Sequence, residues 1–153
     1  MSTWLVRALR VGPTRDTRFF NSTGARVIAG LLPGAPVCDW TNARGLRDHP
    51  APTDIAAHTV GRVARAWLEG SSVFAEIVIE ADRVERDLQA REREGTLYDL
   101  GVSLQLAEVQ LGPAMHDYWV IEGAAAVLAL DFVAEPAGDR ACVLKHILTK
   151  EPS

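Results

Sequence analysis

The 153-residue sequence has little of several features that would narrow its function at once. It contains only two cysteines, Cys38 and Cys142, and their separation matches no metal-binding motif, so both are expected to be free thiols in a reducing compartment. No stretch approaches the roughly 18 apolar residues of a membrane span, and the N-terminus lacks the apolar segment of a signal peptide. We therefore expect a cytosolic protein with no membrane partner, no metal and no cofactor.

Positive charge is not in excess either. Lys and Arg number 16 against 20 Asp and Glu, and no basic stripe is present, so nucleic acid is not an expected partner. Hydrophobic residues make up 48% of the chain and charged residues 24%, as in ordinary globular proteins. The length suits one domain over residues 1–153, with a core at about 20–148 and a C-terminal tail at 149–153.

What the sequence does contain is a clearly alternating segment around Ser103. Aliphatic residues at 100, 102, 104 and 106 alternate with Gly101, Ser103 and Gln105. This period predicts a half-buried strand whose aliphatic face lies on the core and whose polar face carries the Ser103 hydroxyl. A serine at such a position is most often a plain surface residue, so its role depends on the rest of the chain.

Two further polar residues stand in unusual surroundings. His49 follows Asp48 and precedes Pro50 in a long segment, residues 33–52, that is rich in Pro, Gly, Asn and Asp and predicts a loop. Asp131 is the one charged residue in the apolar run 127–133, which predicts a buried strand. A carboxylate inside such a strand needs a partner, because burying it alone is costly.

The remaining patterns predict a mainly β fold with a few helices. Val60–Trp67 and Val73–Glu80 are typical of a hairpin, and strands are expected near residues 3–10 and 118–122. Asp82 to about Arg93 predicts a helix with Asp82 and Glu85 at its capped start, and Ala141–Leu148 predicts an amphipathic C-terminal helix. Residues 25–32 fit either a strand or a helix. We expect a closed or nearly closed barrel of about six or seven mostly antiparallel strands, with both helices packed outside it.

Serine, histidine and aspartate together suggest nucleophilic catalysis. A serine hydroxyl is a poor nucleophile near neutral pH unless a histidine takes its proton and a third group orients that imidazole. Only geometry, not sequence order, constrains such a set, so the residue types by themselves do not show that the three converge.

Three segments, taken together, resemble the phage prohead (capsid maturation) serine proteases, a family related in fold to the herpesvirus assemblins. They are Asp48-His49-Pro50 followed by the strand Val60-Gly61-Arg62-Val63, Gly101-Val102-Ser103-Leu104 directly after a helix, and Leu130-Asp131-Phe132-Val133-Ala134-Glu135-Pro136. They follow the family's order. With the less specific Asn21-Ser22-Thr23-Gly24-Ala25-Arg26, the resemblance covers about residues 20–145.

The resemblance implies Ser103 as the nucleophile, His49 as the general base and Asp131 as the third member. The third member varies within the family, so Glu122 is a competing carboxylate, and His58 is an alternative for the base or the third member. The chain lacks the paired downstream arginines of the assemblins, so backbone amides are expected to form the oxyanion site.

The resemblance also implies a function: an endopeptidase that cleaves phage scaffold and major capsid proteins, and itself, during head maturation. It would act in the host cytoplasm, inside the immature prohead, as a monomer or a homodimer. Two alternatives stay open. One is a catalytically silent relative that serves as a scaffold or an internal head structural protein. The other is an unrelated β-barrel binding module with Ser103 at its surface.

Overall fold

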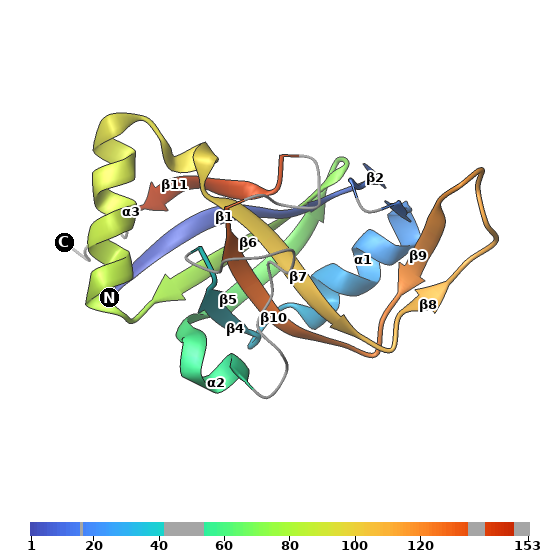
Figure 1. Cartoon of the computed structure of the whole chain (residues 1–153), viewed down its shortest axis with the longest axis horizontal. Helices are drawn as coiled ribbons and strands as arrows, with labels where there is room; N and C mark the ends of the chain where they lie inside the picture. Colours follow the sequence, from blue (N-terminus) through green and yellow to red (C-terminus); the bar gives the residue numbers. More distant parts are fainter. Residues whose placement is uncertain (16, 42–53, 135–139, 149–153) are drawn as a thin grey trace.

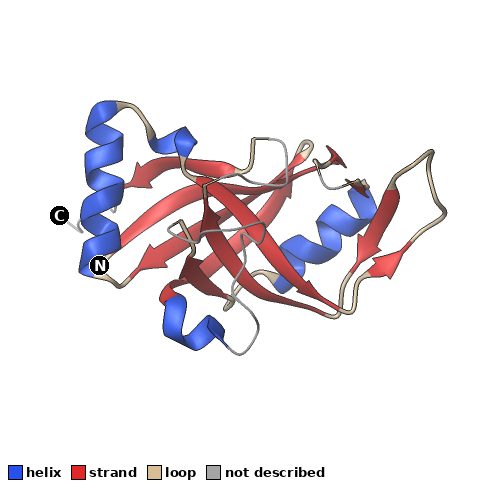
Figure 2. Ribbon diagram, in the orientation of Figure 1, coloured by secondary structure: helices blue, strands red, loops and turns tan. Residues whose placement is uncertain are grey.

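The computed structural model describes residues 1–15, 17–41, 54–134 and 140–148, and within them seven strands close into a barrel (Figure 2). Around the barrel the order is β1-β11-β7-β10-β4-β5-β6. The strands are β1 Ser2–Arg10, β4 Pro36–Asp39, β5 Thr59–Glu69, β6 Ser72–Ile79, β7 Gly101–Ala107, β10 Ala126–Val133 and β11 Cys142–Ile147. All neighbours are antiparallel except β10 and β4, which are parallel, so the expected mainly β barrel is confirmed with one parallel pairing.

A smaller sheet stands beside the barrel. Its order is β2-β3-β9-β8, with β2 Gly12–Pro13, β3 Arg18–Phe20, β9 Trp119–Gly123 and β8 Gln110–Leu111. Figure 1 shows β8 and β9 at the end of the molecule opposite α3 (Asp82–Glu94), with α1 (Ser22–Leu31) between β9 and the barrel. The strand expected near 118–122 is therefore present as β9, but it belongs to this second sheet.

The hairpin and the central helix agree with the sequence patterns. β5 and β6 are joined at Gly70, whose φ of 60° lies in the left-handed region that glycine adopts without strain. Helix α3 buries Val84 and Leu88 and ends at Gly95, also left-handed with φ 72°. Its N-cap is Ala81, with no side-chain capping bond, while the expected capping residues Asp82 and Glu85 lie in the first turn.

Of residues 25–32, which fit either a strand or a helix, 25–31 belong to α1 and Leu32 is its C-cap. The Asn21 side chain caps this helix by accepting a hydrogen bond from the Gly24 N–H at 2.7 Å. Ala25 and Ile28 are buried in the core. The cap and the apolar stripe together account for the helix.

Two predictions are wrong. The segment 141–148 contains the strand β11 (Cys142–Ile147), not a helix, because Val143 and its neighbours complete the barrel by pairing with β1. Residues 33–52 are not a loop throughout: Val37 and Cys38 are buried in β4, between β10 and β5. Residues 42–52 of that segment, with His49, lie outside the described residues, as does the expected tail at 149–153.

No helix in the described part of the chain has the length and apolar character needed to cross a membrane. Both cysteines are free thiols, as expected, and both are buried.

Candidate active site

Ser103 and Asp131 lie directly opposite each other on neighbouring antiparallel strands. Ser103 is on β7 and Asp131 is its register partner on β10, and Figure 1 shows these two strands side by side. Opposed residues in an antiparallel pair point to the same face, with Cβ atoms about 4.5–5.5 Å apart. The serine is 6% exposed and the aspartate 0% exposed, so the polar face of β7 is covered at this point and not solvated.

An extra residue in β10 determines the face on which Asp131 lies. The register shifts between Val127, which pairs with Leu106, and Ala129, which pairs with Gln105, so Leu128 is a β-bulge residue. With strict alternation, Asp131 would share the face of Val127, which points into the core. Because of the bulge, Asp131 lies on the outer face with Ser103.

The neighbours of Asp131 along the strand confirm this assignment of faces. Leu130 and Phe132 are both fully buried members of the barrel core. The outer face of β10 therefore carries Ala129 and Asp131, and the inner face carries the large apolar side chains.

The row of paired residues continues from Asp131 onto two more strands. Cys38 on β4 pairs with Asp131, and Thr59 on β5 pairs with Cys38. The Cys38 thiol donates to the Ile55 carbonyl at 3.6 Å and lies 3.9 Å from the Thr59 hydroxyl. Burial raises the pKa of this thiol, and the nearby charge of Asp131 raises it further, against the hydrogen bond with Thr59. Cys38 is thus held as a neutral thiol beside the carboxylate.

Gln105 is a contact of the site to which the sequence analysis assigned no role. Its side-chain Nε2 donates a hydrogen bond to Asp131 Oδ2 at 3.0 Å. Gln105 lies two residues after Ser103 on the same face of β7, and this spacing was the only signal in the sequence. The expectation that a carboxylate in this strand needs a partner is met here.

Ser103 also lines a small pocket between β7, β1 and the second sheet. Leu9 of β1, Thr14, and Arg18 and Phe20 of β3 contribute to its walls. The Arg18 guanidinium lies over the Phe20 ring, 5.6 Å from its centroid. Besides Ser103, Thr14 and Arg18 are the polar residues of this pocket, and the rest of its lining is apolar.

β11 meets β7 at one end of the site and then follows β1. The described pairing between β7 and β11 is Gly101 with Cys142, next to a hydrogen bond of 2.9 Å from the Val102 N–H to the Ala141 carbonyl. From there β11 runs along β1, and Figure 1 shows it diverging from β7.

The structure places neither alternative residue opposite Ser103. Glu122 is on β9 in the second sheet, with its carboxylate next to Gly112. His58 is the last residue of α2 (Ile55–His58) and directly precedes Thr59. Thr59 lies three strands from Ser103 in the row of paired residues, which is roughly 14 Å measured along the sheet. The His58 ring packs edge-on against Trp40 at 4.3 Å. Of the two carboxylates, Asp131 is the one brought opposite Ser103.

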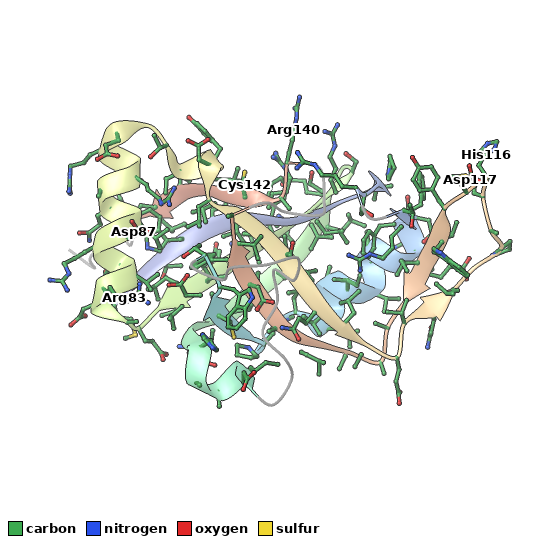
Figure 3. The ribbon with its side chains drawn as sticks, viewed as in Figure 1. Arg83, Asp87, His116, Asp117, Arg140 and Cys142 are labelled. Atoms are coloured by element: carbon green, nitrogen blue, oxygen red, sulfur yellow. The ribbon has the colours of Figure 1, made fainter. Side chains whose placement is uncertain are left out.

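The other two histidines lie elsewhere. His116 is at the exposed tip between β8 and β9, next to Asp117 (Figure 3). His146 is on β11, with its ring 4.7 Å from that of Trp4 and its backbone N–H bonded to Glu92 at 3.1 Å. Within the described residues, no group of three or more His, Cys, Asp and Glu side chains is arranged to hold a metal ion.

Comparison with known protein families gives no match to this chain, and no curated protein sequence matches it.

Proposed function

We propose that this chain is a serine endopeptidase that processes scaffold and capsid proteins, and itself, during phage head maturation. The observation that carries the proposal is the opposition of Ser103 and Asp131 on β7 and β10, with both side chains on the covered outer face. A hydroxyl and a carboxylate in such a row supply the first and third members of a serine–histidine–aspartate set. The resemblance around Asp48-His49-Pro50 supplies the second.

Each residue has one task in the proposed reaction. The His49 imidazole takes the proton of the Ser103 hydroxyl as its oxygen attacks the scissile carbonyl, and then gives that proton to the leaving amine. Asp131 stays ionised, orients the imidazole and stabilises its positive charge. Water then hydrolyses the acyl-enzyme with the same histidine as base. Hydrogen-bond donors near Ser103, including backbone amides, stabilise the oxyanion.

Extended segments of scaffold and capsid protein are the substrates in this proposal. A peptide can add as a strand beside β7, where β11 departs toward β1, and so gain backbone hydrogen bonds with little demand on its side chains. Affinity gained in this way is modest. Confinement of enzyme and substrate within the prohead, at effective concentrations on the order of millimolar, compensates for it.

Labelling with a fluorophosphonate probe tests the activity. The wild-type chain should take the label on Ser103, Ser103→Ala should take none, and His49→Ala should react slower by on the order of 10³ or more. His58→Ala is the matched control and should react like the wild type. A folded wild-type chain that takes no label, or a Ser103→Ala variant that is labelled equally, would refute the proposal and favour a silent structural relative.

Co-assembly separates the activity from its confinement. Purified protein should cleave dilute free scaffold more slowly than the same amounts assembled in proheads. Equal rates would refute the role of confinement and leave the peptidase assignment unchanged.

A further inference from the structure

The contact between Gln105 and Asp131 joins two side chains that share the outer face of the barrel with Ser103. Gln105 Nε2 lies 3.0 Å from Asp131 Oδ2, and the aspartate is 0% exposed. A hydrogen bond to a charged group is stronger than one between neutral groups, and burial strengthens it further. The amide therefore strongly constrains the orientation of the carboxylate.

The local backbone explains why the amide reaches this carboxylate. The residue directly opposite Gln105 is Ala129, whose small side chain is fully buried. A long side chain can then extend to the diagonal neighbour on the facing strand, about 7–8 Å away between backbone positions. That neighbour is Asp131, which lies on this face because of the bulge at Leu128.

We propose that Gln105 is a positioning residue for the catalytic arrangement. It holds Oδ2 of Asp131 and fixes the plane of the carboxylate opposite Ser103. This inference rests on the proposed function. A glutamine suits the task because its amide donates a hydrogen bond without adding a charge or a titrating group beside the carboxylate.

A second possibility is that Gln105 only satisfies a buried carboxylate and so serves folding. The two roles differ in what they predict for reaction rate. A purely structural contact contributes to stability and has no direct effect on the rate, whereas a positioning contact acts on the rate through the Asp131 carboxylate alone. The two therefore differ in how the Gln105 and Asp131 substitutions combine.

The test is fluorophosphonate labelling of Gln105→Met, which keeps the volume and removes the donor. Gln110→Met on the exposed strand β8 is the control for the substitution itself. In Gln105→Met the limiting labelling rate should fall about tenfold or more, as expected for losing one hydrogen bond to a charged group, with the probe concentration at half-saturation unchanged. If Gln105→Met fails to fold, Gln105→Asn, which keeps the amide but is too short to reach, replaces it.

The decisive measurement repeats the substitution in an Asp131→Asn background. There Gln105→Met should cause no further loss of the residual rate. An unchanged rate in the single variant, or the same fold loss in both backgrounds, overturns the positioning role while wild-type labelling on Ser103 preserves the proposed function. A wild-type chain that takes no label overturns the proposed function and this inference with it.

Discussion

Deletion of Leu128 should leave the protein folded, although this residue lies inside a barrel strand. Leu128 is the extra residue of the bulge, so its removal restores a regular ladder. Val127 still pairs with Leu106 and Asp131 still pairs with Ser103, each on its present face. Because Leu128 is only partly buried, we expect the deletion to cost little of the free energy of unfolding.

Deletion of Leu130, two residues later, should be far more damaging. Asp131 can keep its place opposite Ser103 only if the bulge disappears and Ala129 moves into the core position of Leu130. Leu130 is fully buried, so this exchange equals a leucine-to-alanine change in the core, which costs about 3–5 kcal/mol. The other outcome turns the Asp131 carboxylate into the core, at an effective cost of several kcal/mol.

Urea unfolding followed by circular dichroism measures both deletions, with Leu128→Ala as the control for loss of the side chain alone. We expect the Leu130 deletion to lower the free energy of unfolding by about 3 kcal/mol or more relative to the Leu128 deletion. The Leu128 deletion should also keep fluorophosphonate labelling of Ser103. Equal losses in the two deletions, or a Leu128 deletion that does not fold, would refute the assignment of faces in β10.

Three further outcomes are expected. Asp131→Asn should keep the fold but lower the labelling rate by about 10⁴, because the amide no longer holds the imidazole in the required tautomer; a small loss would remove Asp131 from the proposed set. Burial would raise the pKa of Asp39, but hydrogen bonds from Thr41 and Arg83 outweigh it and hold that pKa below its usual value. The stability that Asp39 adds is therefore complete above about pH 4, the pKa in the unfolded chain, and is lost as the pH falls through the lower pKa of the folded protein. Thr41→Val removes one of these hydrogen bonds and should weaken this pH dependence, as measured by urea unfolding at acidic and at neutral pH. Burial raises the pKa of the Cys38 and Cys142 thiols, so iodoacetamide near neutral pH should modify them slowly in the native protein and quickly in urea, and rapid native modification would contradict their burial.

The ion pair between Arg83 and Asp39 contributes little to stability because its arginine is exposed to solvent. The guanidinium reaches from α3 and donates to Asp39 at 2.9 Å, and Figure 3 shows Arg83 on this helix together with Asp87. The arginine side chain is 65% exposed, so solvent screens the pair and the hydrogen bonds from Thr41 are the more durable support for Asp39.

Elements with a complete local signal were predictable from the sequence. The β5–β6 hairpin has two alternating segments around Gly70, and α3 has an apolar stripe that ends at Gly95. The strand around Ser103 has strict alternation over its length. In each case the signal depends only on residues close in sequence, which is why no knowledge of the rest of the fold was needed.

In short apolar segments without such signals, the secondary structure depends on the strands that pack beside them. Residues 141–148 carry apolar spacing that a helix could also use, but the barrel needs a strand between β1 and β7, and β11 occupies that position. β4 is only four residues long in a Pro- and Gly-rich segment, and it exists because Val37 and Cys38 are buried between β10 and β5. Propensity alone does not decide elements of this length.

The sequence by itself determined that Ser103 lies on a strand with an aliphatic inner face, and that Asp131 lies in a buried strand and needs a partner. Only the tertiary structure decided that the two residues face each other and that Gln105 is a partner of Asp131. The physical reason is the bulge at Leu128: one extra residue reverses the alternation of faces, and nothing in an apolar run marks where that reversal occurs. Register between strands far apart in sequence therefore set the geometry of the candidate site.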